Sequence, residues 1–120
     1  EDEAAACIRG VVAVNDVTAR DLQKTDGQWT RAKGFDTFCP LGPEGVAAKS
    51  LNELGLVTRV NGVERQRATA GEMVFSIPRL IAYISGIMTL LPGDVIATGT
   101  VISFVFCATA LTKLELRCSQ

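Results

Sequence analysis

One short segment of the chain brings together side chains that could bind both a cation and an anion. Asp16 is followed by Arg20 and Gln23, and Lys33 comes shortly after. If a helix begins near Val17, Asp16, Arg20 and Gln23 share one helical face, and Lys33 could return to them by a loop. Such a group could hold a hard cation and an anionic substrate. The spacing alone favours a simpler alternative, a surface salt bridge between Asp16 and Arg20 with Lys33 in solvent.

The residue types limit the chemistry further. The four cysteines, Cys7, Cys39, Cys107 and Cys118, form no C-x-x-C pair, and the chain has no histidine. Both facts argue against a zinc site and against a thiol nucleophile with a histidine base. We expect reduced, mostly buried cysteines in a cytosolic protein, with a thiol-based redox protein as a further alternative. Acid–base chemistry would then run through carboxylates, Lys33 or a metal-bound water.

Composition indicates one globular domain. A chain of 120 residues, 48% hydrophobic and 21% charged, can bury a core and is not typical of disorder. The net charge of −1 gives no general attraction to nucleic acid or to an anionic membrane. The longest apolar stretch, Leu80 to Leu91, is too short to span a bilayer, and the first residues lack the features of a signal peptide. We expect a cytoplasmic protein without a nucleic-acid or membrane partner.

The elements that would position these residues can be read from periodicity. Glu1 to Ala6 favours a helix, and the β-branched run Ile8 to Val14 predicts a buried strand. Thr18 to Lys24 suggests one or two helical turns. Gly27 to Gly45 has no clean period and reads as a long loop, a kind of segment that often carries function.

The second half predicts a hairpin, a helix and further strands. Asn61-Gly62, between the extended segments 57–60 and 63–66, favours a type I′ turn. Ser76 and Pro78 suit the start of a helix. The helix would carry a core-facing apolar stripe: Leu80, Ile81, Ile84, Ile87, Met88 and Leu91. Residues 95–100 predict a strand, and residues 101–117 predict one or two more.

Several longer motifs resemble one known family. The sequence reads Val-Asn-Asp-Val-Thr-Ala-Arg-Asp-Leu-Gln at 14–23 and Gln-Trp-Thr-Arg-Ala-Lys-Gly-Phe-Asp-Thr-Phe-Cys-Pro-Leu-Gly-Pro at 28–43. Further motifs follow in order at 59–62, 73–78 and 89–100. Together they resemble the C-terminal catalytic-domain segment of the fumarylacetoacetate hydrolase family over about residues 4 to 100.

The resemblance implies a fold and a set of site residues. The fold would be β-rich α+β, the family's mixed β-sandwich roll in incomplete form, with residues 1–100 as the catalytic segment and residues 101–120 as a non-matching, β-prone tail. Asp16 matches the ligand of Mg²⁺ or Mn²⁺, with Ca²⁺ as a further option. Arg20 and Gln23 match substrate-pocket residues. Lys33 matches the catalytic lysine that steadies an enolate or oxyanion, and Thr100 matches a threonine near the substrate's carboxylate or keto oxygen.

The implied function is that of a divalent-metal-dependent hydrolase, decarboxylase or isomerase. Its substrates would be small β-dicarbonyl or 2-oxo acids: acylpyruvates, fumarylacetoacetate, oxaloacetate or hydroxy-diene-dioates, some of them met in the catabolism of aromatic compounds. Members of the family commonly form homodimers. The alternative is a catalytically inactive fragment that only associates with a full-length subunit.

Three departures from the family pattern limit what the resemblance implies. The family's Glu-x-Glu metal ligands lie roughly thirty residues before the aspartate, whereas fifteen residues precede Asp16, and Glu1 and Glu3 are not expected to replace them. The histidine–glutamate pair of hydrolytic members has no counterpart here. After Thr100 the sequence does not align with the family motif. We therefore expect a segment that begins inside the catalytic domain.

Overall fold

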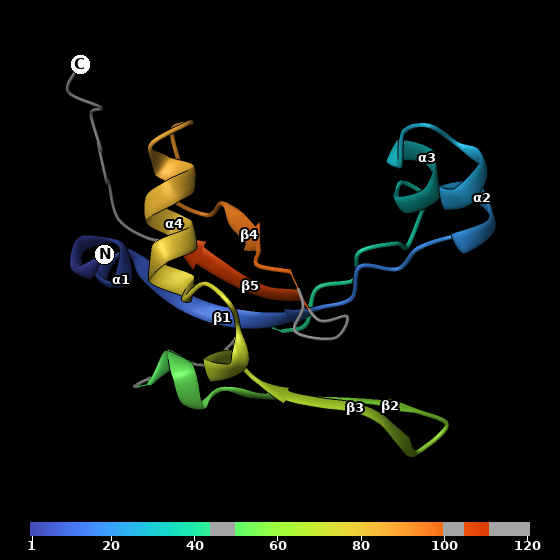
Figure 1. The fold of residues 1–120 in the computed structure, drawn as a ribbon, viewed down its shortest axis with the longest axis horizontal. Helices are drawn as coiled ribbons and strands as arrows, with labels where there is room; N and C mark the ends of the chain where they lie inside the picture. Colours follow the sequence, from blue (N-terminus) through green and yellow to red (C-terminus); the bar gives the residue numbers. More distant parts are fainter. Residues whose placement is uncertain (44–49, 100–104, 111–120) are drawn as a thin grey trace.

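The first β-branched run forms the edge of a three-stranded antiparallel sheet. The computed structural model describes residues 1–43 and 50–99, and the backbone of residues 105–110. The sheet order is β1 (Ile8–Val14), β5 (Val105–Ala110) and β4 (Val95–Ala97), so the strand latest in the sequence lies in the middle. Its register places Val12 opposite Cys107. The predicted strand at 8–14 is confirmed, and the tail supplies at least one of its predicted strands (Figure 1).

Two helices pack beside this sheet and close its core. They are α1 (Asp2–Ala6), which confirms the predicted N-terminal helix, and α4 (Ile77–Ser85). Their small and branched side chains meet β4 and the turn that begins at Ala70 in one buried cluster. Its members are Ala4, Ala70, Ile77, Ile81 and Ile96.

Helix α4 begins as its sequence predicts. The Ser76 hydroxyl accepts a hydrogen bond from the backbone N–H of Arg79 at 3.4 Å, and Pro78 lies in the first turn. A serine cap satisfies one of the backbone donors that a helix start leaves free, and proline has no N–H to lose there.

The apolar stripe of α4 is only partly a core element. Ile81 is 1% exposed and Ile84 packs against the core cluster. Ile87, Met88 and Leu91 are 64%, 58% and 60% exposed, so their prediction as core residues is wrong for the part of the chain that the structure describes. The physical reason is that the helix ends at Ser85, and later residues no longer follow its buried face.

The strands β2 (Gly55–Val60) and β3 (Val63–Thr69) form a separate two-stranded hairpin. Asn61 and Gly62 have φ values of 52° and 78°, the two positive values that a type I′ turn requires. The predicted hairpin is confirmed, and both of its strands extend further at the base than expected. Short 3₁₀ turns, η1 (Leu51–Glu53) and η2 (Ala70–Glu72), join its base to the body.

Residues 15–40 leave the sheet after β1 and return beside its end; we call them the arm. The arm holds α2 (Arg20–Thr25) and α3 (Thr30–Lys33) and lies apart from the sheet (Figure 1). At its base the N–H of Asn15 donates to the carbonyl of Pro40 at 3.2 Å. The loop predicted over 27–45 therefore contains a helical turn, which its irregular pattern did not indicate.

The architecture is a small mixed α/β domain with an open sheet. This confirms the α+β class, while the closed β-sandwich roll stays a prediction. Strand β4 covers only the start of the strand predicted over 95–100. Thr100 and the alternating segment 113–117 lie outside the described residues. Among the helices that the structure does describe, none has the length and apolarity needed to cross a membrane.

Candidate active site

The arm positions Asp16 at the point where β1 ends. Two backbone hydrogen bonds hold its two ends together: Asn15 N–H to Pro40 at 3.2 Å, and Gly42 N–H to the carbonyl of Ala13 at 2.8 Å. A Cβ on Gly42 would lie 3.3 Å from that same carbonyl, so a glycine suits this close approach. Asp16 is thus anchored to the sheet on its N-terminal side and to the returning chain.

Lys33 reaches Asp16 from the other side of the arm. Its ammonium donates to the carboxylate Oδ2 of Asp16 and lies 3.4 Å from the hydroxyl of Thr18. The Lys33 and Asp16 side chains are 29% and 46% exposed, so both remain open to a small molecule. The return of Lys33 to Asp16 is confirmed.

An ion pair with this exposure adds at most about 1 kcal/mol to folding. The ion pair therefore matters more for the geometry of the site than for stability, because it places a fixed positive charge beside a carboxylate at the surface. The alternative read from spacing, an Asp16–Arg20 salt bridge with Lys33 in solvent, is wrong, because the described partner of Asp16 is Lys33.

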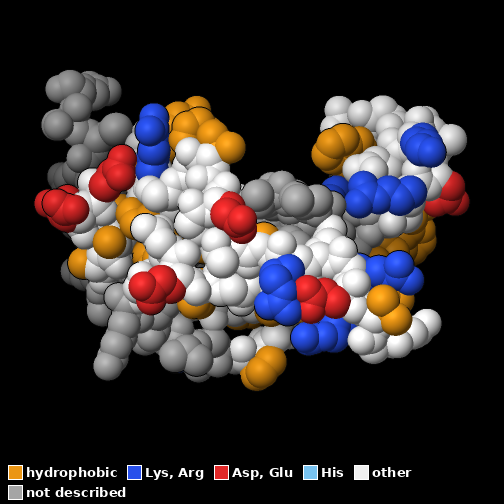
Figure 2. All heavy atoms as spheres, turned by 60° about the horizontal axis from the view of Figure 1, so that its bottom comes forward, with side chains coloured by type: hydrophobic (Ala, Val, Ile, Leu, Met, Phe, Trp, Pro, Cys, Tyr) orange, Lys and Arg blue, Asp and Glu red, His pale blue; other side chains and the backbone are white. Residues whose placement is uncertain are grey.

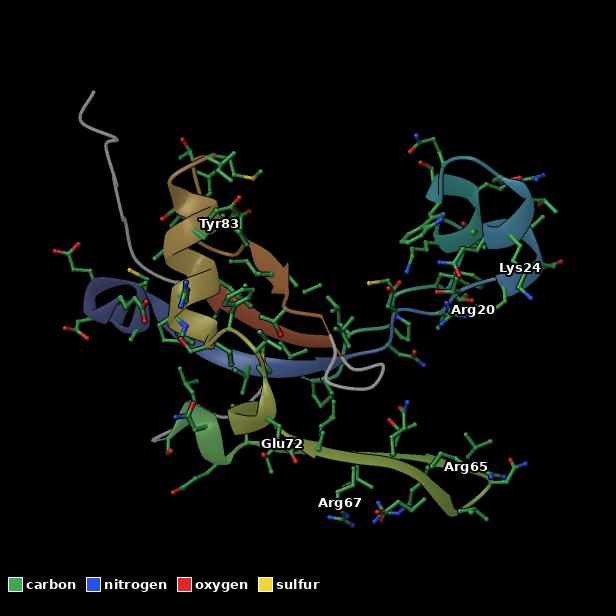
Figure 3. The ribbon with its side chains drawn as sticks, viewed as in Figure 1. Arg20, Lys24, Arg65, Arg67, Glu72 and Tyr83 are labelled. Atoms are coloured by element: carbon green, nitrogen blue, oxygen red, sulfur yellow. The ribbon has the colours of Figure 1, made fainter. Side chains whose placement is uncertain are left out.

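Arg20 and Gln23 form a second polar pair on α2. The guanidinium Nη1 of Arg20 donates to Oε1 of Gln23 at 2.8 Å, across one helical turn on an exposed face. Figure 3 shows Arg20 at the arm, away from α4. The helix begins at Arg20, later than Val17, so the expectation that Asp16 shares its face is wrong. Only one of the five guanidinium donors is used in this bond, which leaves others for an anion.

Local contacts hold α2 and α3 together. Ala32 is fully buried, and its carbonyl accepts a hydrogen bond from the N–H of Ala19 at 2.9 Å. The guanidinium of Arg31 donates two hydrogen bonds, of 2.9 and 2.7 Å, to the carboxylate of Asp26. These hydrogen bonds to the Arg31 guanidinium lower the pKa of the Asp26 carboxyl. Because Lys33 lies one residue beyond Ala32, this packing also fixes where its side chain starts.

A cavity of about 420 Å³ lies between the base of the arm and the hairpin. Its walls come from residues 13–15 and 40–42 on one side and from hairpin residues such as Thr58 and Gln66 on the other. Asn15 lines it, but Asp16 and Lys33 do not. Figure 2 shows most of the Lys and Arg side chains of one face at the end formed by the arm and hairpin.

The described residues do not make a magnesium site. Within residues 1–43 and 50–99, no group of three or more histidine, cysteine or acidic side chains is placed to hold a metal ion. Asp16 is a single carboxylate and is already paired with Lys33. Mg²⁺ gives up its water only where several oxygens converge, so one carboxylate does not fit it. Glu1 and Glu3 lie at the opposite end of β1, about 20 Å away by strand length, which agrees with their exclusion as ligands.

Thr100, the cysteines and Thr18 complete the comparison of the predicted residues with the structure. Thr100 lies outside the described residues. Cys7 is buried as expected, whereas Cys39 is exposed, and both are free thiols. Sequence reasoning missed Thr18 as a partner of Lys33. The sequence signal was its position two residues after Asp16. In the structure the Thr18 hydroxyl donates to the Asp16 carbonyl at 3.0 Å, which holds Thr18 close to Asp16.

The arrangement of arm, sheet and helix has a known counterpart. The family model described as fumarylacetoacetate (FAA) hydrolase C-terminal matches residues 1–114. The chain belongs to the fumarylacetoacetate hydrolase family. Members of this family are enzymes of small organic acids and generally depend on a divalent metal ion.

Relatives with a named activity include enzymes of three kinds. The oxaloacetate tautomerase of Bacillus subtilis is 52% identical over 94 residues, which cover 76% of this chain and 31% of the relative. The 2,4-didehydro-3-deoxy-L-rhamnonate hydrolase of a Sphingomonas strain is 43% identical over 83% of this chain and 36% of its own length. The structure of 5-carboxymethyl-2-hydroxymuconate delta-isomerase from Mycobacterium smegmatis is 50% identical with a TM-score of 0.78, over 86% of this chain and 41% of its own.

The chain spans about two-fifths of the length of the curated relatives it matches. The part that matches the family model, residues 1–114, includes the arm, the hairpin and α4. The family fold is therefore shared over the part of the relatives that this chain covers.

Proposed function

We propose that this chain is the part of a small-acid enzyme that stabilises negative charge on a substrate oxygen. The substrates would be 2-oxo or β-dicarbonyl acids of the oxaloacetate, acylpyruvate, fumarylacetoacetate or hydroxy-diene-dioate class. The observation that carries the proposal is the Lys33 ammonium, held at Asp16 and Thr18 and still partly open to solvent. The family membership of the chain supports it.

One kind of intermediate connects the reactions named for the relatives. Tautomerisation and isomerisation of an oxo acid, and carbon–carbon cleavage of a β-dicarbonyl acid, all place negative charge on an enolate oxygen. A fixed ammonium beside that oxygen stabilises the charge as it forms. Lys33 would do this, while Arg20 and Gln23 would hold a carboxylate of the acid. Thr100 is proposed to contact a carboxylate or keto oxygen.

We also propose that Asp16 contributes one ligand to Mg²⁺ or Mn²⁺, with Ca²⁺ as a further option. The described residues alone do not form such a site, so the proposal requires oxygen ligands from elsewhere, in the family a Glu-x-Glu pair. Homodimer formation and a cytoplasmic location are proposed on the same family basis.

The test follows the enol absorbance of oxaloacetate with the full chain, with and without millimolar Mn²⁺. Wild type should accelerate enol–keto exchange, and Lys33→Met should lose about 100-fold or more, as removal of an oxyanion donor does elsewhere. Lys24→Met, a cation on the exposed side of α2 (Figure 3), is the matched control and should keep wild-type activity.

Calorimetric titration of Mn²⁺ tests the metal proposal separately. Micromolar binding that disappears in Asp16→Ala would support it. Absence of both binding and turnover would contradict the enzyme proposal for this chain alone.

A second candidate has support of its own: an inactive subunit that only associates with a full-length member of the family. Two observations favour it. Among the described residues, Asp16 belongs to no group of three or more acidic, histidine or cysteine side chains that could hold a metal ion. Tyr83 on α4, and Ile87 and Met88 just after it, expose apolar surface. Contiguous exposed apolar surface often marks a protein interface. Co-elution with a full-length family member, without turnover by either metal-loaded or metal-free chain, would select this candidate.

A further inference from the structure

Trp29 lies against the side chain of Lys33. The Lys33 Nζ is 5.7 Å from the centroid of the indole ring. The two residues bracket α3: Trp29 is its N-cap, Lys33 is its last residue, and the Lys33 N–H donates to the Trp29 carbonyl at 3.0 Å. Side chains four positions apart on a helical turn lie on the same face. One turn of helix therefore brings the ring and the ammonium together.

The ammonium thus has partners from two segments of the arm. Asp16 and Thr18 belong to the chain leaving the sheet, and Trp29 belongs to the start of α3. The face of an aromatic ring carries partial negative charge and attracts a cation, and tryptophan does so best. A lysine side chain has four rotatable bonds and reaches many positions when it is free. Three partners restrict it to the region beside Asp16.

Burial does not explain the place of Trp29. Its side chain is among the exposed large hydrophobic groups, with 56% of the residue open to solvent. The arm has its own aromatic pair elsewhere, Phe35 and Phe38, with ring centroids 5.4 Å apart. Trp29 is not part of that pair, and its described ring contact is with the cation.

We propose that Trp29 is a positioning residue for Lys33. Its ring holds the ammonium beside Asp16 and Thr18, so that the charge is already in place when an acid binds. The purpose of this positioning rests on the proposed function of Lys33, whereas the contact itself does not. The ligand class is the one proposed above, a small 2-oxo or β-dicarbonyl acid, one oxygen of which meets the ammonium next to the indole.

The contact is tested by proton NMR of the full chain. The chain has four lysines, so the Lys33 Cε methylene signal can be assigned by its loss in Lys33→Met. The indole ring current should move this signal upfield in wild type, and Trp29→Leu should return it to the position of a free lysine. Trp29→Phe, which keeps a ring, should retain part of the shift.

Phe35→Leu is the matched control, because Phe35 is an exposed aromatic residue of the same arm with no described cation over its ring. It should leave the Lys33 signal unchanged. A Lys33 signal that does not move in Trp29→Leu overturns the inference. So does an equal movement in Phe35→Leu, since that would indicate a general change in the arm.

The consequence for binding is tested with oxalate, a chemically stable small dicarboxylate, whose binding is followed through the same Lys33 signal. Trp29→Leu should weaken the affinity about three-fold, the range of an exposed cation–π contact, and Trp29→Phe should recover most of it. Equal affinity in Trp29→Leu and wild type overturns the positioning role. If oxalate binds no variant, the proposed function fails for this chain, and the signal of Trp29→Leu without ligand still decides the contact.

Discussion

Gly34, the residue after Lys33, offers a sharp test of how the arm is built. A Cβ at this position would lie 2.6 Å from the backbone carbonyl oxygen of Thr30. That oxygen belongs to the first residue of α3, and this helix has only four residues. The carbonyl cannot retreat without unwinding the turn that carries Lys33. Overpacking of this kind costs about 1–3 kcal/mol, so Gly34→Ala should lower the unfolding free energy of the arm by that amount.

The assay is urea unfolding followed by the fluorescence of Trp29. This residue is the single tryptophan of the chain and lies in the arm itself. With a typical urea dependence of about 1–3 kcal/mol per molar, the midpoint should fall by roughly 1 M. The reading requires one cooperative transition, which coincidence with far-ultraviolet circular dichroism checks.

Gly27→Ala is the matched control in the same arm. A Cβ on Gly27 would meet no atom within 4 Å. This substitution should leave the midpoint unchanged or raise it slightly, because alanine restricts the unfolded chain more than glycine does. If Gly34→Ala unfolds at the same urea concentration as Gly27→Ala, the close approach to Thr30 does not constrain the arm, and the reasoning is refuted.

Three further predictions concern the body, the arm and the hairpin. Ile81→Ala should lower the unfolding free energy by about 2–5 kcal/mol, because the residue is 1% exposed, whereas Ile87→Ala should cost far less, because Ile87 is 64% exposed. Thermal or urea unfolding compares the two variants, and equal losses would contradict the core described above. Arg31 lowers the pKa of the Asp26 carboxyl in the folded state, so the pair stabilises the arm at pH values above the ordinary carboxyl pKa, and this stabilisation disappears as the pH falls through the lowered pKa. Urea unfolding followed by Trp29 fluorescence should therefore show lower stability at about pH 3 than at neutral pH, and Asp26→Asn should reduce the difference. An identical pH profile in wild type and Asp26→Asn would contradict the prediction. Gly62 has a φ of 78°, so Gly62→Ala should destabilise the hairpin by about 1 kcal/mol, seen as faster amide hydrogen exchange in β2 and β3 and not in β1.

The parts of the fold that follow from short-range rules could be predicted from the sequence. Asn61-Gly62 makes its turn because asparagine and glycine tolerate positive φ, and Ser76 with Pro78 starts α4 because both suit a helix end. These signals act within a few residues. They needed no knowledge of the rest of the structure.

The parts that depend on distant neighbours could not be predicted in the same way. The period of Ile87 and Met88 indicates a shared face, but not where the helix ends or what covers that face, and both side chains are exposed. In the same way, the spacing of Asp16 and Arg20 suggested an ion pair between them. The chain returns through α3, however, and brings Lys33 to Asp16, so the ion pair forms between these two residues. Family motifs, which carry long-range information, identified Asp16 and Lys33 together.

The sheet order also determines when the domain can fold. Its middle strand, β5, is the last in sequence, and Val12 of β1 pairs with the backbone of Cys107. Closing a loop of roughly 95 residues costs about 4 kcal/mol of chain entropy before any strand pairing compensates. During synthesis the arm and the hairpin, whose contacts are local, can form on the emerging chain, whereas β1 and β4 wait for β5. Until residue 110 has left the ribosome, the inner edge of β1 is available to chaperones or to other chains.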